Sequence, residues 1–260
     1  MEDRNVNCLS RWYPKLEKTG VNTPKTLITR TDLPLMNFLD GEAVPGAESF
    51  YATLDDFATT VGYPCFLRTG QGSAKHHWED TCFLKSKEDI PKHVTELVEW
   101  SCLADIMGLP HDVWVVRELL ETGPYFHAFG NMPITRERRF FIDKGKIIGQ
   151  IPYWPEDAFE DALHKPVDWR EKLKEMNNLS SSDESYLRDE TFKVSQEFEG
   201  PWSVDWLQLK NGDWHCIDMA VGPMSYGWDQ VCRDTDQSDE DTIGDDGTIT
   251  LNRIDDQEDC

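Results

Sequence analysis

The chain has 260 residues with a formal net charge of −23, and 38% of its residues are hydrophobic, with ten tryptophans among its aromatic residues. This length and apolar content are enough for one large domain or two small ones, which excludes an intrinsically disordered protein. The acidic balance excludes general nucleic-acid binding, which depends on Lys and Arg at the phosphate backbone. Seven cysteines without a Cys-x-x-Cys spacing, and no apolar run long enough to span a bilayer, predict a cytoplasmic protein with reduced thiols and no membrane partner.

Residues 1–60 mix short apolar runs with turn signals. A strand is predicted at 26–29, and Thr53 is expected to cap a short helix that ends near Gly62. No recognisable chemistry lies in this segment. We therefore predict a lead-in that packs on the core of the protein.

Residues 61–121 carry a strand that ends in a cation and then a loop of small residues. The predicted elements are, in order, a strand at 65–69, a loop at 70–77, a strand at 81–85, a helix from Asp89 to about 104 and a strand at 113–117. Glycines let backbone N–H groups approach a phosphate closely, and Lys75 adds a point charge to the loop. The loop is not a Walker A loop, because the Gly-Lys-Ser/Thr ending is missing, and a plain turn is the alternative.

Residues 122–228 begin with two strands, 136–143 and 146–151, which turn at Lys144-Gly145. Helical segments follow within 156–198, and Ser180 to Ser182 provide a good helix start. We expect these helices to be architectural.

Residues 202–219 predict two further strands joined at Asn211-Gly212, the dipeptide most typical of a type I′ turn. With a two-residue turn, Asp205 lies directly opposite Asp218. The Cβ atoms of such a pair are about 4.5–5.5 Å apart, so the two carboxylates repel each other unless a cation lies between them. The same face is expected to carry apolar residues that require burial, namely Leu207, Leu209, Trp214 and Cys216.

A metal ion is one solution for the two opposed acids. Mg²⁺ is commonly held by one or two carboxylates together with the phosphates of a substrate. The alternative for the hairpin alone is a solvated end with two screened acids. The hairpin therefore predicts a magnesium site that needs support from the rest of the chain.

Residues 229–260 contain twelve acidic residues against Arg233 and Arg253, and apolar residues are scarce. This composition predicts a disordered acidic tail. Deleting residues 229–260 is then expected to leave the melting temperature nearly unchanged.

The order of these parts resembles the ATP-grasp fold, an α+β fold in which two lobes with antiparallel sheets hold ATP between them. The resemblance covers about residues 60–228 and implies a small lobe at 61–121 and a large lobe at 122–228. Residues 140–154 and 217–223 are also similar to the ATP-grasp proteins that assemble translation initiation factor two, and to uncharacterised phage and bacterial relatives.

The resemblance implies ATP and Mg²⁺ as cofactors and gives roles to particular residues. Arg68 takes the place of the usual strand lysine over the α- and β-phosphates. The flexible loop that covers the phosphates is implied to bind them through Gly70, Gly72, Ser73 and Lys75. The interlobe linker that meets the adenine is implied to consist of Glu118, Leu119, Leu120 and Glu121, with Glu121 or Tyr125 near the ribose.

Three further positions follow from the resemblance. Glu137-Arg138-Arg139 is similar to the Glu-x-Arg of the family, so Arg139 is expected to reach the phosphates and, with Lys75, to be catalytic. Asp205 and Asp218 match the two acidic metal positions. Ala220 stands where the family usually places an asparagine ligand.

Two functions are implied. The first is an ATP-dependent carboxylate–amine or carboxylate–thiol ligase, which acts through an acyl phosphate on an acceptor that the sequence does not identify. The second is a non-ligating ATP-binding assembly factor for a protein partner. Ala220 favours the second, whereas the cations at 68, 75 and 139 are neutral between the two.

Overall fold

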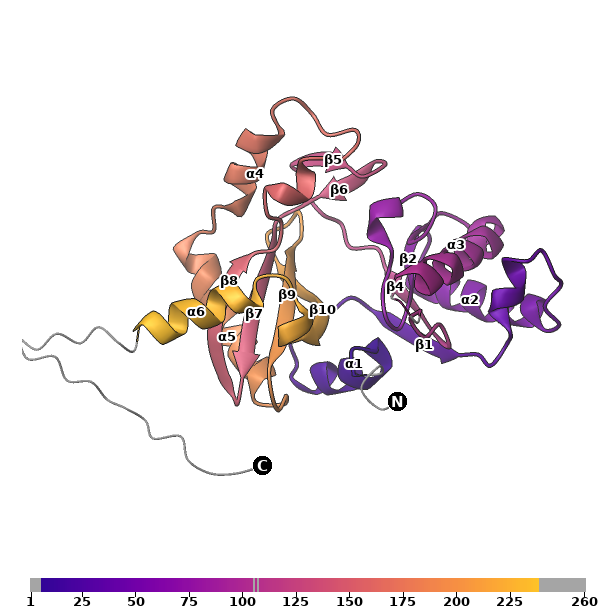
Figure 1. Cartoon of the computed structure of the whole chain (residues 1–260), viewed down its shortest axis with the longest axis horizontal. Coiled ribbons are helices and arrows are strands. Elements are labelled where there is room, and N and C mark those ends of the chain that lie inside the picture. Colours follow the sequence, from indigo (N-terminus) through magenta and orange to yellow (C-terminus); the bar gives the residue numbers. More distant parts are fainter. Residues whose placement is uncertain (1–5, 105, 107, 239–260) are drawn as a thin grey trace, which may run out of the picture.

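Two lobes, each built on a four-stranded antiparallel sheet, make up the protein (Figure 1). The computed structural model describes residues 6–104, 106 and 108–238. The strand order is β1-β4-β2-β3 in the first sheet and β10-β9-β7-β8 in the second. The prediction of an α+β fold with two antiparallel sheets is confirmed.

The first lobe packs two helices on one face of its sheet. Its elements, with η standing for a 3₁₀ helix, are β1 (Thr26–Arg30), η2 (Leu35–Phe38), α2 (Ala47–Val61), β2 (Cys65–Thr69), η3 (Lys75–His77), β3 (Phe83–Leu84), η4 (Lys87–Asp89), α3 (Ile90–Leu103) and β4 (Val113–Glu118). Trp114 and Val116 of β4 are buried against α2 and α3. Val115 and Arg117 point to the opposite face because side chains alternate along a strand, and that face is turned toward the second lobe.

The predicted lead-in, residues 1–60, belongs to both lobes. Strand β1 pairs with β4 along its whole length, and α2 covers the same sheet, so the helix is longer than the one expected from Thr53. Helix α1 (Leu9–Lys18) places Leu9, Trp12 and Leu16 in the core of the second lobe. The segment therefore contributes elements to both lobes.

Among the described residues, the second lobe holds the other sheet, a small hairpin, three α-helices and two 3₁₀ helices. Its elements are β5 (Phe126–Ala128), β6 (Met132–Ile134), β7 (Glu137–Asp143), β8 (Lys146–Pro152), η5 (Asp157–Phe159), α4 (Trp169–Asn177), α5 (Ser181–Ser195), β9 (Trp202–Gln208), β10 (Trp214–Val221), η6 (Gly222–Met224) and α6 (Trp228–Ser238). Lys144 and Gly145 both have positive φ, as the predicted two-residue turn requires. The Ser180 side chain accepts a hydrogen bond from the Asp183 N–H, so the predicted helix start is confirmed.

The β9–β10 hairpin brings Asp205 opposite Asp218, as predicted, but by a different route. Its loop has three residues, since the Leu209 N–H bonds to the Asp213 carbonyl and Gly212 has a φ of 95°. A β-bulge at Ile217 then shifts the register by one residue and restores the opposition of the two acids.

The same bulge also places the β10 side chains before it on the opposite side of the sheet from the one expected. Trp214 and Cys216 are therefore buried in the core under α1 and α5, and the expectation that they share a face with the two acids is wrong.

The predicted tail begins with helix α6, so the boundary at residue 229 is wrong. Val231 is 5% exposed and packs with Phe141 and Ile151. A Cβ at Gly149 would lie 2.3 Å from the Val231 side chain, so only glycine leaves room for this helix on β8. Residues 239–260 lie outside the described part of the chain, and the prediction of disorder there stays a prediction.

A chain that ends after Gly227 should therefore be less stable than the full chain, because Phe141 and Ile151 lose their cover. Burial of side chains of this size contributes about 2 kcal/mol. That corresponds to a fall of about 5 °C in the melting temperature of a chain of this length. A chain that ends after Ser238 is the matched control, since it keeps every described contact. Equal melting temperatures for the two truncated chains would contradict the role of α6.

Candidate functional site

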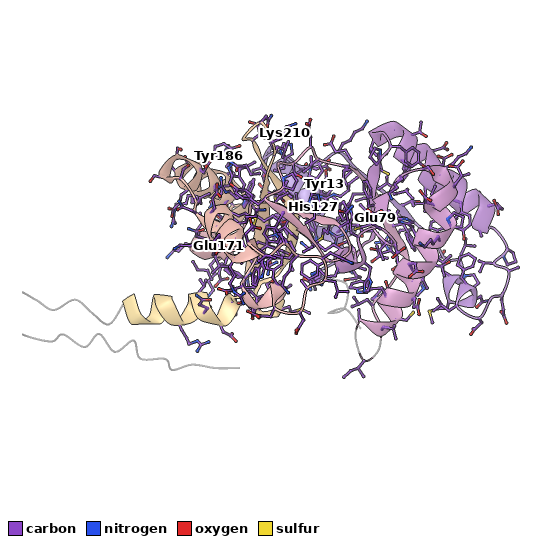
Figure 2. All side chains as sticks on the ribbon, turned by 90° about the horizontal axis from the view of Figure 1, so that it is seen from above. Tyr13, Glu79, His127, Glu171, Tyr186 and Lys210 are labelled. Atoms are coloured by element: carbon purple, nitrogen blue, oxygen red, sulfur yellow. The ribbon has the colours of Figure 1, made fainter. Side chains whose placement is uncertain are left out.

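A cavity of about 700 Å³ lies between the two sheets. Its walls come from β2, the 71–79 loop and the 117–122 segment on one side, and from β9, β10 and the start of β7 on the other. Figure 2 shows two of the residues that line it, Glu79 and His127, in the central part of the molecule. Aromatic, aliphatic and charged side chains all contribute to its lining.

The predicted metal acids are each paired with a predicted phosphate cation. Arg139 donates two hydrogen bonds to Asp205, from Nε to Oδ1 at 2.7 Å and from Nη2 to Oδ2 at 2.8 Å. Arg68 Nη1 lies 3.2 Å from Asp218 Oδ2. Burial lowers the pKa of Arg139, but Asp205 beside it more than compensates, so the pKa is raised and the group stays charged.

Lys75 reaches from the first lobe into an aromatic pocket of the second. Its Nζ lies 4.2 Å from the ring centroid of Tyr153, 4.6 Å from that of Trp154 and 3.7 Å from Glu137 Oε2. His76 next to it stacks on Phe129 with ring centroids 4.4 Å apart. The loop that the sequence predicts as flexible is thus docked on the opposite lobe.

Glu137 is a site residue that the sequence reasoning named only as part of a motif. Its side chain is 5% exposed, Oε1 accepts a hydrogen bond from Trp154 Nε1, and Oε2 has no hydrogen-bond partner among the described residues. Burial raises its pKa, whereas the nearby Lys75 acts in the opposite direction.

Replacing Lys75 with methionine should make stability more sensitive to pH. Methionine keeps the packing on the two rings but leaves the buried Glu137 carboxylate unpaired, at a cost of about 3 kcal/mol. The pKa of Glu137 is already raised by burial, and without Lys75 it rises further. A carboxyl group whose pKa is higher in the folded than in the unfolded state stabilises the fold fully below the unfolded-state pKa, which is about 4.3 for Glu. This stabilisation is lost as the pH rises through the folded-state pKa.

The melting temperature of Lys75→Met should therefore lie further below that of the wild type at pH 8 than at pH 5. Lys85→Met removes an exposed ion pair with Glu79 and serves as the control. If the melting temperature of Lys75→Met lay equally far below that of the wild type at both pH values, the pairing of Lys75 with Glu137 would be contradicted.

Arg117 is a further cation of the cavity that the sequence reasoning missed. It is 4% exposed, and burial together with the neighbouring Arg68 lowers its pKa to about 10, so it stays protonated at neutral pH. The available signal was an arginine at the end of the apolar run Val113-Trp114-Val115-Val116, the same pattern that singled out Arg68.

The other predicted site residues are divided between the cavity and its surroundings. Gly72, Ser73, Glu118, Leu119 and Leu120 line the cavity together with Arg68, Lys75, Asp205 and Asp218.

Gly70 and Glu121 are not part of the cavity lining. The Gly70 N–H and C=O bond to Val113 and Leu9, and a Cβ there would lie 2.5 Å from Cys8 Sγ. The Glu121 side chain is 80% exposed and pairs with Lys210. Tyr125 accepts a hydrogen bond from Arg136.

The described residues contain no group of three or more His, Cys, Asp or Glu side chains that could hold a metal ion. Two carboxylates, Asp205 and Asp218, are what this site offers, so further ligands have to come from a substrate phosphate or water. Ala220 follows in β10 and supplies no ligand.

No protein-family model and no curated protein matches this sequence. Solved structures do match in fold. C-terminally truncated Cdc123 from Schizosaccharomyces pombe superposes with a TM-score of 0.57 at 14% identity, over 89% of this chain and 92% of that one. A second Cdc123 structure from the same organism gives a TM-score of 0.56 at 14% identity, over 90% and 92%.

ATP-grasp ligase PsnB, solved with a minimal precursor, aligns at 13% identity and a TM-score of 0.45, over 86% of this chain and 55% of its own. N5-carboxyaminoimidazole synthase from Aspergillus clavatus, solved with ADP and its ribonucleotide, aligns at 14% identity and a TM-score of 0.46, over 84% and 44%. The chain shares its fold with the two Cdc123 structures. The chain spans about half the length of PsnB and of N5-carboxyaminoimidazole synthase.

The two four-stranded sheets face each other across the charged residues described above. Within the described residues, no helix is both long enough and apolar enough to cross a membrane.

Proposed function

We propose that the chain binds ATP with Mg²⁺ in the cavity between its two sheets. The observation that carries this proposal is the meeting of three cations, Arg68, Lys75 and Arg139, with the opposed pair Asp205 and Asp218 in a chain that is otherwise strongly acidic. A triphosphate offers oxygens for charge-assisted hydrogen bonds from these cations. The fit of the acids to Mg²⁺ rests on their hard oxygen donors and their opposition across two strands.

The ion pairs between these groups are compatible with a bound nucleotide. An ionised carboxylate has about four lone-pair sites, and Arg68 uses only one oxygen of Asp218. Mg²⁺ can therefore share Asp218 with Arg68, and would add positive charge beside the phosphates. Lys75 Nζ and Arg139 Cζ lie 4.2 Å and 4.7 Å from the centroid of the same Tyr153 ring. Both side chains can therefore contact the same end of the triphosphate.

The reaction that we propose is ATP-dependent ligation of a carboxylate to an amine or thiol. A carboxylate oxygen attacks the γ-phosphorus, the bond from this phosphorus to the β,γ-bridging oxygen breaks, and ADP leaves. The amine or thiol then attacks the acyl carbon and phosphate leaves, while the proton of the nucleophile passes to solvent. Lys75 and Arg139 would position the transferred group and spread its charge, which is the main requirement of such chemistry.

The second candidate is an ATP-binding assembly factor that performs no ligation. The likeness to Cdc123 extends over nearly the whole of both chains, and it supports this candidate together with the resemblance to the assembly proteins of translation initiation factor two. Ala220, which removes a metal-ligating side chain, points the same way. In this role ATP would fix the angle between the lobes, and the client would be a protein.

Release of ADP decides between the two candidates. The purified chain is incubated with Mg²⁺-ATP and pools of carboxylic acids and amines, and ADP is measured over time. A ligase releases ADP only when its acid is present, and Arg139→Met abolishes the release. ATP binding without acid-dependent ADP release in any pool would contradict ligation and favour the assembly factor.

A further inference from the structure

The β-bulge at Ile217 creates a contact between the lobes that the sequence does not show. β10 is the edge strand of the second sheet, and the bulge lies between Cys216 and Asp218. The carbonyl of Ile217 accepts a hydrogen bond from Nη1 of Arg117, which belongs to β4 of the first sheet. Residues 100 positions apart in the chain are thereby joined directly beside one of the two acids.

Two further contacts hold Arg117. Nε donates a hydrogen bond of 2.9 Å to Thr26 Oγ1 in β1, and the guanidinium lies 5.5 Å from the ring centroid of Tyr13 in α1. The side chain is buried, and Nη2 has no hydrogen-bond partner within the described chain. The buried, charged guanidinium of Arg117 therefore contacts three other elements, β1, α1 and β10. An apolar side chain of similar length could not donate these hydrogen bonds.

Two arginines of the first sheet thus reach consecutive residues of β10. Arg117 binds the Ile217 carbonyl, and Arg68 binds the Asp218 carboxylate with Nη1 and Oδ2 3.2 Å apart. The two contacts differ in kind, because one fixes the backbone and the other pairs with the side chain. A backbone fixed at residue 217 limits where the carboxylate of residue 218 can lie.

We propose that Arg117 is a positioning residue that fixes the backbone of the Ile217 bulge, and so sets Asp218 for metal binding and fixes the spacing of the two lobes at this point. The proposal rests on the proposed Mg²⁺-ATP site. Arg117 touches neither metal nor nucleotide in this role. It acts through Asp218, as residues that orient metal ligands do.

The test compares ATP affinity with Mg²⁺ and with EDTA, because the ratio of the two dissociation constants reports on metal binding and not on folding. In Arg117→Met the gain in affinity from Mg²⁺ should fall about 10-fold or more, the usual cost of losing a residue that orients a metal ligand. Affinity in EDTA should change little, since the phosphate-binding cations remain. Thr26→Val removes the hydroxyl that holds Nε and should lower the gain in the same direction by a smaller factor.

Arg30→Met is the matched control, because Arg30 lies in β1 next to β4 and its ion pair with Asp112 is exposed. An unchanged Mg²⁺ gain in both Arg117→Met and Thr26→Val would overturn the positioning role, and Thr26→Val alone decides the question if Arg117→Met does not fold. A wild-type chain that binds no ATP would instead overturn the proposed function, so the two failures are distinguishable.

Discussion

Replacing Arg139 with methionine is expected to lower the free energy of unfolding by about 3–5 kcal/mol, the cost of leaving one member of a buried ion pair without its partner. Asp205 is 4% exposed and receives both of its Arg139 hydrogen bonds at 2.7 Å and 2.8 Å. The variant should also lose the stabilisation that Mg²⁺-ATP gives the wild type, because Arg139 is one of the cations proposed to hold the phosphates. Chemical denaturation with and without Mg²⁺-ATP measures both effects.

The double variant Arg139→Met/Asp205→Leu separates stability from binding. It removes both charges, so most of the lost stability should return. Nucleotide binding should stay absent. Arg188→Met breaks an exposed ion pair with Glu184 and should cost only about 0.5 kcal/mol. A single Arg139→Met variant with wild-type stability and a wild-type response to Mg²⁺-ATP would contradict the account of this pair.

Replacing Asp218 with asparagine should remove the magnesium dependence of ATP binding while the fold stays intact. The Asp218 side chain is 40% exposed, and asparagine keeps a carbonyl oxygen that can accept a hydrogen bond from the buried Arg68, so the substitution should cost little stability. At a hundred times its dissociation constant, Mg²⁺-ATP should stabilise the wild type by about 2.7 kcal/mol. In Asp218→Asn the stabilisation should fall to the value that ATP gives in EDTA.

Asp213→Asn changes an exposed acid directly after the loop of the same hairpin and serves as the control. It should keep the full response to Mg²⁺. If both Asp205→Asn and Asp218→Asn kept that response as well, the assignment of the metal to these two acids would be wrong.

The opposition of Asp205 and Asp218 was predictable from the sequence, although the reasoning assumed the wrong loop. A three-residue loop moves the register by one residue, and the bulge at Ile217 moves it back. The bulge has no local signal, because Ile217 is an ordinary strand residue. Its carbonyl accepts a hydrogen bond from Arg117 of the other lobe, a partner 100 positions away in the chain.

Elements with local signals were predictable, and those that depend on distant partners were not. Strand β2, the Lys144-Gly145 turn and the Ser180 cap follow from neighbouring residues. Helix α6 depends on the space above Gly149, some 80 residues earlier, and its sequence by itself reads as an acidic tail.

The site shows the same division. The sequence singled out Arg68, Lys75, Arg139 and the two acids by their types and order. It could not show that the loop of Lys75 docks on Tyr153 and Trp154, because these rings come from the other lobe. Gly70 was expected at the phosphates for its small size, whereas its size makes room for Cys8 and Val113.

Titration of the full chain with ATP, followed by tryptophan fluorescence, tests the central claim most directly, since Trp78, Trp100 and Trp154 line the cavity. The account predicts a saturable change with one nucleotide per chain, tighter binding with Mg²⁺ than with EDTA, and no change in the double variant Arg68→Met/Arg139→Met. The absence of any saturable change in the wild type, or an equal change in the double variant, would contradict it.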